Sequence, residues 1–554
     1  MKIIKNIVII SVVILVTAVF ANAQTNAYNI IPKPVKLEPK QGQFVFNSKT
    51  QIVVPGKNED IQNAVLALTE RLLLSSGMNL EVTDNSLGKI KPGKNMVFCK
   101  LTPSISNKEG YRLKIKKERI EIEAGSAAGI FYAMQTVRQL MPPEIERNAV
   151  TNNVVWAVPC AVIEDEPRYP YRGTHIDVAR HFSNATEIKR QIDNMAFHKI
   201  NRFHWHLTDN EGWRIEIKQY PQLTAVGAWR NWIWDMATAK NINYPNYGGF
   251  YTQEELKDVV AYAKKKFITI IPEIEIPGHS GAAIRSYSWL ACAGKGNTGV
   301  YCSKATSFEF LEKVIAEMLE IFPGEYIHIG GDEVNKDYWE SCDDCKAVMT
   351  SENLHNGDGL QSYFIKRIET FVNSKGRKII GWEEIMHGGL APNATVMQWL
   401  GGNSGYEAAK QGHDVVMAVK DYCYFNYVQS TLPTEPSAHC CDEVNEIYGG
   451  VFMPHVYSFD PTPEELTTAE AKHILGVQNC LWSERIPTMA HMEYLLFPRL
   501  AALSEVAWTP KKEKNYEDYL LRLTGIMKHY DAMNINYSRS HLTLPTLSTA
   551  TESN

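Results

Sequence analysis

The sequence predicts an α/β protein, a (β/α)8 barrel of the TIM type preceded by a small α+β domain. Short apolar runs alternate with helical segments from Arg172 onward, and a compact α+β pattern comes before them. Residues 148–165 are the expected seam between the two regions, and Pro167 and Pro170 mark the entry into the second. A doubly wound open sheet is the alternative, but the Gly-rich phosphate loop expected of it is missing. The eight candidate barrel strands are residues 174–178, 202–207, 268–271, 326–329, 378–381, 395–398, 414–418 and 474–480.

The first region alternates strand and helix patterns. Residues 43–54 are a candidate strand and residues 60–75 an amphipathic helix. Residues 111–123 alternate apolar and polar side chains around a Lys-Glu turn, which predicts a β-hairpin. A helix over residues 126–141 stops at two prolines. We expect a signal peptide (1–23), an N-terminal α+β domain (24–166), the barrel (167–510) and a C-terminal helix and tail (511–554).

The N-terminus has the features of a cleavable signal peptide. Lys2 and Lys5 precede an apolar run over residues 7–20, and Ala21-Asn22-Ala23 ends it. The run is short for a membrane anchor, the alternative, and no cysteine marks a lipoprotein cleavage point. We therefore expect an exported protein, either periplasmic or secreted to the cell surface, with no transmembrane anchor after cleavage.

Charge and composition exclude some partners. The formal net charge is −5, and it becomes −7 without residues 1–23, which carry Lys2 and Lys5 and no acidic residue. The chain has no basic block, so nucleic acid is not an expected partner. The sequence does not indicate an oligomeric state.

The cysteines are compatible with an oxidising compartment, because their number, ten, is even. Cys292 and Cys302 flank a Gly-rich loop and could staple it. Cys342 and Cys345 form a C-x-x-C, but no second such motif or nearby His pair completes a zinc set. We therefore expect a structural pair or free thiols rather than a metal site.

Polar and aromatic side chains follow the candidate strands, where a (β/α)8 barrel collects its active site. The strongest signal is residues 326–334, in which an apolar strand runs into two glycines and then Asp332 and Glu333. Two carboxylates in one apolar pocket separate in pKa, which suits acid/base chemistry. The other candidates are Asp177, Asp209, Glu275, Trp382, Trp399, Tyr424 and Trp482 to Glu484.

Six spaced motifs make the chain resemble glycoside hydrolase family 20, the β-N-acetylhexosaminidases, over nearly its whole mature length. H-x-G-G-D-E is present as His328 to Glu333. The others are D-x-x-R-H-F at 177–182, H-W-H-L-T-D at 204–209, P-E-I-E-x-P-G-H at 272–279, G-W-E-E at 381–384 and W-S-E at 482–484.

The resemblance implies substrate-assisted hydrolysis of terminal β-linked N-acetylglucosamine or N-acetylgalactosamine, with the 2-acetamido group as nucleophile and an oxazolinium intermediate. Glu333 would be the general acid/base, protonated at rest through a raised pKa. Asp332 would stay ionised and orient the acetamido group.

The resemblance also assigns the binding residues. Arg180 and Glu484 would bind the 3- and 4-hydroxyls, and Asp209 with His279 would tune the pKa of Glu333. Trp382, Trp399 and Trp482 would line the pocket, and the Tyr424 hydroxyl would donate to the acetamido oxygen. The family pattern calls for no metal or organic cofactor.

One position departs from the family. Asn426 stands where the family commonly has Asp near the 6- or 4-hydroxyl. The loss of a negative charge predicts tolerance of an anionic group on O6, such as a sulfate, although Asn could equally be a neutral hydrogen-bonding replacement.

Two other functions remain open. A family relative could release a disaccharide, which would need a more open pocket. A non-catalytic glycan-binding protein on the same scaffold should have lost Asp332 or Glu333, and both are present. The expected partner in every case is an oligosaccharide or glycoconjugate.

Overall fold

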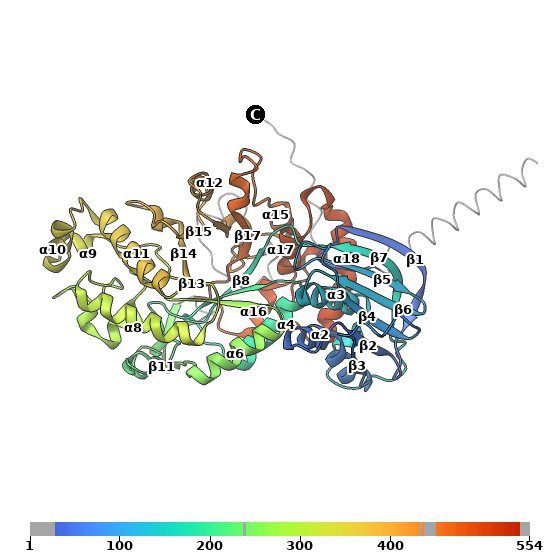
Figure 1. Ribbon diagram of the computed structural model, residues 1–554. Helices are drawn as coiled ribbons and strands as arrows, with labels where there is room; N and C mark the ends of the chain where they lie inside the picture. The colour runs from blue at the N-terminus through green and yellow to red at the C-terminus, as the bar shows by residue number, and fades with distance from the viewer. Residues whose placement is uncertain (1–27, 236–239, 433–434, 437–449, 543–554) are drawn as a thin grey trace, which may run out of the picture.

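The computed structural model describes residues 28–235, 240–432, 435–436 and 450–542. A β-sheet domain and a barrel stand side by side, with the C-terminal helices packed between them (Figure 1). The predicted signal peptide and the end of the tail, residues 543–554, lie outside the described residues. In the described part of the chain, none of the helices has the length and apolar character needed to cross a membrane.

A mixed seven-stranded sheet with the order β1-β7-β5-β6-β4-β2-β3 forms the N-terminal domain. The predicted hairpin is confirmed as the antiparallel pair β5 and β6. The single strand expected over residues 43–54 is wrong. It is two strands, because Asn47 and Thr50 form a turn in which the Thr50 amide donates to the Asn47 carbonyl at 2.9 Å. The strands are β1 (Lys36–Val45), β2 (Gln51–Val54), β3 (Glu81–Asp84), β4 (Met96–Leu101), β5 (Tyr111–Lys116), β6 (Arg119–Ala124) and β7 (Ala157–Asp165).

Two helices, α2 (Glu59–Ser76) and α3 (Ala127–Leu140), pack against each other in this domain. The Asn58 side chain caps α2 by accepting from the Ile61 amide, and Gly77 ends it in the left-handed conformation. Both predicted helices are therefore confirmed, with boundaries set by ordinary capping residues.

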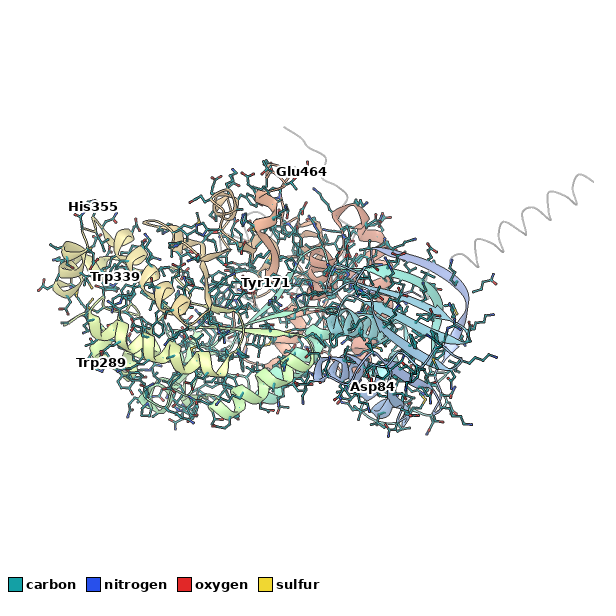
Figure 2. The ribbon with its side chains drawn as sticks, in the orientation of Figure 1. Asp84, Tyr171, Trp289, Trp339, His355 and Glu464 are labelled. Atoms are coloured by element: carbon teal, nitrogen blue, oxygen red, sulfur yellow. The ribbon has the colours of Figure 1, made fainter. Side chains whose placement is uncertain are left out.

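Eight parallel strands close into the predicted barrel, so the TIM fold is confirmed. Figure 2 marks Tyr171, the first residue of β8, near the middle of the molecule. Each strand overlaps one of the eight predicted runs. They are β8 (Tyr171–Asp177), β9 (Arg202–His206), β12 (Thr269–Glu273), β13 (Tyr326–His328), β14 (Lys378–Trp382), β15 (Thr395–Gln398), β16 (Val415–Met417) and β17 (Ile474–Asn479).

Helices connect the barrel strands and lie outside them (Figure 1). Asn184 and Thr252 begin α4 and α6 with complete capping boxes. A hairpin of β10 (Trp229–Asp235) and β11 (Lys240–Gly248) extends the segment after β9. The connecting helices include α4 (Ala185–Phe197), α6 (Gln253–Lys265), α8 (Ala305–Ile321), α11 (Gly357–Ser374) and α12 (Ser404–Lys410), and α16 (Met489–Leu496) and α17 (Arg499–Trp508) follow the last strand.

The sheet domain contacts the barrel at the end where the strands begin. Arg172, at the start of β8, forms an ion pair with Glu109 at 2.8 Å. The Asp165 carboxylate accepts from Lys199 Nζ at 2.9 Å and from Trp508 Nε1 at 2.8 Å. The C-terminal helix α18 (Tyr516–Met533) completes this junction. In the described part of the chain, these contacts leave the opposite end of the barrel, where the strands end, free of the sheet domain.

Candidate active site

Two glycines shape the turn that follows β13. Gly330 and Gly331 have φ angles of +66° and +101°, which glycine adopts without strain. A Cβ atom on Gly330 would lie 1.9 Å from Glu275 Oε2, and one on Gly331 would lie 2.4 Å from Ile385 Cγ2. The chain can therefore turn tightly here and bring the next two carboxylates to one side.

Asp332 and Glu333 both face a cavity of about 140 Å³ at this end of the barrel. Asp332 is 8% exposed, whereas the Glu333 side chain is 59% exposed. The cavity is lined by Arg180, His279, Asp332, Glu333, Trp399, Tyr424, Asn426, Tyr427, Trp482 and Glu484.

The structure thus brings nine of the eleven predicted site residues to one cavity, while Asp209 and Trp382 lie behind it. Asp209 Oδ2 lies 2.7 Å from Arg180 Nη2, so Asp209 supports the cavity wall from outside. Trp382 is 1% exposed, and its ring centre lies 5.7 Å from that of Trp482. Trp382 therefore backs the wall that Trp482 forms.

Three buried oxygens in the cavity wall have no hydrogen-bond partner within the described residues: Asp332 Oδ1, Asn426 Oδ1 and Glu484 Oε2. Buried polar atoms are ordinarily paired, so unpaired acceptors that meet in one cavity indicate a ligand rich in donors. A sugar, with its hydroxyls and an amide N–H, has this chemistry.

His279 connects the acidic residues. Its Nδ1 atom lies 3.1 Å from Asp209 Oδ1, and its Nε2 atom lies 3.3 Å from Glu333 Oε2 and 3.6 Å from Asp332 Oδ2. Burial lowers the pKa of His279, but the Asp209 and Asp332 carboxylates outweigh it and raise the pKa well above its usual value. The imidazole is therefore positively charged at neutral pH.

The pKa of Glu333 differs from the sequence-based expectation. We expected a raised pKa, but the hydrogen bond from the charged His279 lowers it. The expectation is wrong for the free protein, because the Glu333 side chain is exposed and paired with an imidazolium. Burial raises the pKa of Asp332, and the nearby Glu273 and Glu333 carboxylates add to that rise.

Arg180 is a second cation of the cavity, beside His279. Its guanidinium contacts Asp177 at 3.2 Å and Glu211 at 3.1 Å, in addition to Asp209, and lies 3.7 Å from Glu484. Burial lowers the pKa of Arg180, but these carboxylates together raise it well above its usual value. This network fixes the guanidinium beside Glu484, where both can bind vicinal hydroxyls.

Aromatic rings form the remaining wall. Trp399 and Tyr424 are stacked with ring centres 5.9 Å apart, and Trp399 Nε1 donates to Glu384 Oε2 at 3.0 Å. Tyr427, which our sequence analysis missed, lines the cavity with its ring centre 6.0 Å from that of Tyr424. The only sequence signal for it was its position three residues after Tyr424.

Glu273, at the end of β12, is a second residue that we did not predict. Its fully buried carboxylate lies 2.8 Å from His328 Nδ1 and 3.0 Å from His204 Nε2, contacts His206, and accepts from Trp382 Nε1 at 2.9 Å. It therefore ties together four neighbouring strands beneath the cavity. Glu273 and these histidines stand in motifs that we quoted, but their convergence depends on strand register.

Two groups of buried side chains beneath the cavity lie close enough together to hold a metal ion, namely His175, His204 and Glu273, and His206, Glu273 and Glu275. The ring nitrogens of His204 face Glu273 at 3.0 Å and the Gln478 amide at 2.9 Å. The Glu273 carboxylate is already engaged by three histidines and by Trp382, so we assign no metal here.

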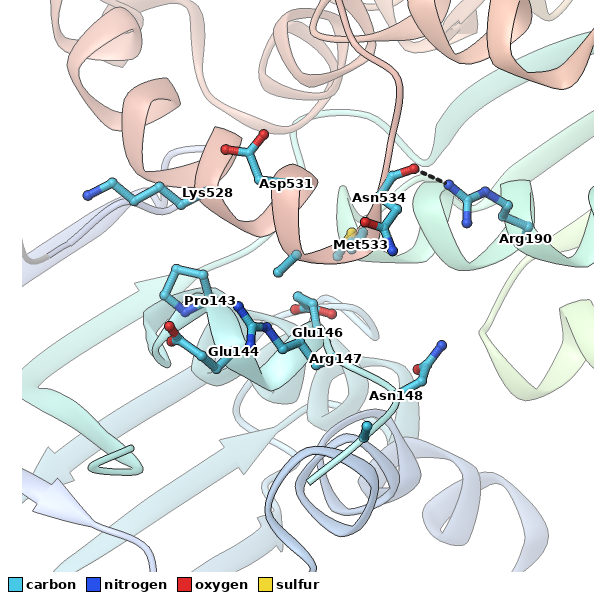
Figure 3. A pocket seen from close by; sticks show the side chains of 12 residues that line it. Pro143, Glu144, Glu146, Arg147, Asn148, Arg190, Lys528, Asp531, Met533 and Asn534 are labelled. Carbon is cyan, nitrogen blue, oxygen red and sulfur yellow. Dashed lines mark hydrogen bonds between the residues drawn. The ribbon is translucent and has the colours of Figure 1, made fainter. Parts of the chain in front are cut away.

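A larger cavity, of about 900 Å³, lies elsewhere, between residues 143–149 and the end of α18 (Figure 3). Its lining includes Glu146, Arg190 and Asn534, and no tryptophan. Arg190 donates to the Asn534 carbonyl at 2.7 Å and pairs with Glu493 at 2.6 Å. Arg190 and Glu146 are paired within the protein, and none of the six sequence motifs contributes to this lining, so we do not consider it a catalytic site.

Comparison with known proteins gives a consistent result. The catalytic domain of glycosyl hydrolase family 20 matches residues 169–511, and domain 2 of the same family matches residues 27–166. A β-hexosaminidase of Porphyromonas gingivalis is 40% identical over 93% of this chain, which spans 65% of that relative's length.

Solved structures agree. The exo β-N-acetylglucosaminidase of Vibrio harveyi, in complex with N-acetylglucosamine, superposes with a TM-score of 0.82 at 34% identity, covering 93% of this chain and 79% of that one. The β-N-acetylhexosaminidase of Bacteroides fragilis has a TM-score of 0.78 at 28% identity, covering 92% and 96%. The chain therefore belongs to glycosyl hydrolase family 20 and is a glycoside hydrolase of the β-N-acetylhexosaminidase type.

Proposed function

We propose that this protein is an exo-acting β-N-acetylhexosaminidase that removes terminal β-linked N-acetylglucosamine or N-acetylgalactosamine through substrate assistance. The observation that carries the proposal is the unpaired, buried Oδ1 atom of Asp332 beside the exposed Glu333 carboxylate in one small cavity. The buried acceptor suits the acetamido N–H, and the exposed carboxylate suits a leaving group at the cavity mouth.

In the first step, the acetamido carbonyl oxygen attacks C1, and the C1–O bond to the leaving group breaks as that oxygen takes up a proton. Asp332 accepts from the N–H, orients the carbonyl and stabilises the positive charge that develops on nitrogen. Because the nucleophile belongs to the substrate, the reaction gains the rate benefit of enforced proximity. Water then opens the oxazolinium ring, gives its proton to Glu333 and preserves the β configuration.

The proton for the leaving group comes from the His279–Glu333 pair. In the free protein the pair holds one proton, which rests on His279. When substrate covers the cavity and excludes water, the charged pair loses hydration, so transfer from Nε2 to Glu333 across 3.3 Å becomes more favourable. Glu333 can then act as the general acid.

The size of the cavity supports an exo mode with a monosaccharide product. A volume of about 140 Å³ is below the ~300 Å³ at which ligand pockets usually begin, so a single sugar is the largest unit it suits. Arg180 and Glu484 lie beside each other at the cavity wall and would bind the 3- and 4-hydroxyls of the terminal sugar. A disaccharide-releasing enzyme would need more room.

Two finer features also belong to this proposal. Asn426 is 3% exposed in the cavity wall and places a neutral amide where a carboxylate would repel an anion, which supports tolerance of a 6-sulfated sugar.

Export to the periplasm or cell surface is supported by the sequence of residues 1–23 and can be tested by cell fractionation.

The mechanism is tested with a thiazoline analogue of the intermediate and with an aryl glucoside that lacks the acetamido group. We expect strong competitive inhibition by the thiazoline and turnover of the glucoside at least ~1000-fold below that of the matched N-acetylglucosaminide. A sugar bound covalently to Asp332 or Glu333, detected by mass spectrometry, would contradict the mechanism. Disaccharide products from a chitin oligomer would contradict the exo monosaccharide mode.

A further inference from the structure

Four cysteines from two distant parts of the sequence meet outside the catalytic cavity. Cys292 and Cys302 come from the long segment after β12, and Cys342 and Cys345 flank the start of α10 (Asp343–Ser351) after β13. The sequence indicated a possible staple for the first pair and a structural pair or free thiols for the second, and it did not indicate that the two pairs meet. In the structure the four sulfur atoms lie within 4.8 Å of one another.

The sulfur positions match a tetrahedral metal site. Cys345 Sγ lies 3.6 Å from Cys292 Sγ and 3.7 Å from Cys302 Sγ, and Cys302 Sγ lies 3.9 Å from Cys342 Sγ. A tetrahedral zinc ion with Zn–S bonds of ~2.3 Å separates its ligand sulfurs by ~3.8 Å. Disulfides would instead sort the sulfurs into two bonded pairs at ~2 Å. Cys345 Sγ lies at nearly equal distances from the sulfurs of Cys292 and Cys302, so the distances do not divide the four sulfurs into two disulfide pairs.

The surroundings also suit a structural ion. All four cysteines are buried, with at most 5% exposed. The Ser303 amide donates to Cys345 Sγ at 3.5 Å, a contact that favours a thiolate, and Asp344 Oδ2 lies 4.0 Å from Cys302 Sγ. A closed set of four sulfurs leaves no open position for a substrate, which is the character of structural rather than catalytic zinc.

We propose that Cys292, Cys302, Cys342 and Cys345 bind one structural zinc ion, which joins the segments after β12 and β13. Four soft thiolates in a tetrahedral arrangement favour zinc over calcium, magnesium or manganese, which prefer oxygen ligands. The thiols lose their protons on binding, so zinc affinity falls as pH falls.

The zinc site lies next to the framework of the active site. The Tyr301 amide donates to the Pro277 carbonyl at 3.0 Å, two residues before His279. Trp339, in α9 (Asp337–Glu340) after Glu333, donates its Nε1 to the Tyr301 carbonyl at 2.8 Å. Figure 1 shows α9 and α10 at the end of the molecule far from the N-terminal sheet, and Figure 2 marks Trp339 there. The ion would therefore hold together the two segments that carry His279 and Glu333.

The first test is the metal content of the mature chain, purified without chelator or thiol reductant. We expect about one zinc per chain by inductively coupled plasma mass spectrometry. A mercurial reagent that modifies thiols should release this zinc to a colorimetric dye. After denaturation in chelator, all four cysteines should react with iodoacetamide.

Variants give the second test. We expect Cys342→Ser and Cys345→Ser to lose nearly all zinc and to lower Tm by at least ~5 °C. Cys99→Ser is the matched control, since Cys99 is buried in β4 of the sheet domain, and it should keep its zinc. A chelator should lower Tm of the wild type and of Cys99→Ser, and leave Cys345→Ser unchanged.

The metal analysis of the wild type decides the proposal even if the variants fail to fold. Protein without zinc would overturn it, whether peptide mapping finds the four cysteines as thiols or in two disulfides. Iron in place of zinc would overturn it as well.

Discussion

His279 Nε2 lies 3.3 Å from Glu333 Oε2, while Nδ1 of the same ring lies 3.1 Å from Asp209 Oδ1. The imidazole therefore stands between a buried carboxylate and an exposed one. The buried partner raises the pKa of the imidazole, and the charged imidazole lowers the pKa of Glu333. We therefore propose that the acid/base group of this site is the His279–Glu333 pair, which shares one proton.

Replacement of Glu333 tests the acid/base role directly. We expect Glu333→Gln to lower kcat on unactivated oligosaccharides by at least ~1000-fold and to change substrate affinity little, because proton transfer is lost and the contacts remain. Aryl substrates with good leaving groups should lose less in the first step. Glu340→Gln, at an exposed position of α9, is the control. Near wild-type hydrolysis of an unactivated oligosaccharide by Glu333→Gln would refute the assignment.

Replacement of His279 should change the pH dependence. In the wild type, kcat/KM should fall at high pH only as His279 loses its proton, at a pH well above the usual imidazole value. It should fall at low pH as Asp332 takes up a proton, above its usual value of 3.8, because Asp332 then loses the negative charge that stabilises the developing oxazolinium. In His279→Gln, Glu333 must hold the proton alone, and its pKa rises because the imidazolium is gone.

We therefore expect the alkaline limb of the His279→Gln profile to move to lower pH. Activity should fall ~10- to 100-fold near pH 7.5 and less near pH 5. The measurement is kcat/KM from pH 4 to pH 9 with one oligosaccharide. An equal loss at every pH would show that His279 only positions Glu333.

Gly330 allows a separate test of the turn. Gly330→Ala adds a Cβ atom 1.9 Å from the buried Glu275 carboxylate, at a φ of +66°. Gly376→Ala is a matched control, because its φ is +72° and nothing lies within 4 Å of its Cβ position. Backbone strain costs ~1–2 kcal/mol at either position. We expect both variants to lose stability and only Gly330→Ala to lower kcat, by at least ~10-fold, because Asp332 and Glu333 follow two and three residues later. Equal kcat values for the two variants would contradict this.

The interface between the sheet domain and α18 should depend on pH through Glu146. Burial raises the pKa of this carboxyl, but Arg138, at 2.5 Å, and His529 outweigh it and lower the pKa to about 2. The pKa is lowered in the folded state, so the ion pair stabilises the protein above pH 4.5, and that stabilisation is lost as pH falls toward 2.

We expect Glu146→Gln to reduce the free energy of unfolding by about 3 kcal/mol at pH 7 and by much less at pH 3. Urea denaturation at both pH values measures this difference. Glu144→Gln, at a half-buried neighbour shown in Figure 3, is the control and should have little effect. An equal loss of unfolding free energy at both pH values would mean that the packing of Glu146, and not its charge, stabilises the protein.

The sequence predicted the barrel because each strand is an apolar run bounded by polar residues and followed by a helical pattern. It failed at residues 43–54, where no glycine or proline marks the turn that Asn47 and Thr50 form through their own hydrogen bonds. Local pattern is sufficient for strands that are buried along their length and so form apolar runs, and insufficient where side-chain hydrogen bonds set a turn.

The cavity residues were predictable because they follow strand ends, but their electrostatics were not. The lowered pKa of Glu333 depends on the position of His279, 54 residues earlier in the chain. The role of Glu273 depends on the register that aligns it with His206 and His328. The four cysteines meet only because β12 and β13 are neighbours in the barrel. These relationships are set by long-range contacts that no local pattern records.

Asn426 gives the prediction that is most specific to this chain. It lines the cavity beside Tyr424 and Tyr427, is 3% exposed, and its Oδ1 atom has no partner within the described residues. Two negative charges ~4 Å apart repel by ~1 kcal/mol in water and by several times that at a partly desolvated site. A carboxylate at this position should therefore discriminate against a 6-sulfated sugar, and the neutral amide should not.

We expect Asn426→Asp to lower kcat/KM for 6-sulfated aryl N-acetylglucosaminide at least ~10-fold relative to the unsulfated substrate, since 1.36 kcal/mol corresponds to a factor of ten in rate. Asn426→Ser is the control for loss of the amide, because it removes the side-chain contacts without adding charge. The selective loss should shrink at high ionic strength if the effect is electrostatic, although screening is weaker at a buried site. Tolerance of the sulfated sugar is a weaker property than preference for it, because preference would need a cation near the sulfate. Arg180 is the only Lys or Arg among the described residues that line the cavity. If Asn426→Asp affects both substrates equally, then Asn426 is a neutral hydrogen-bonding replacement and the sulfate hypothesis fails.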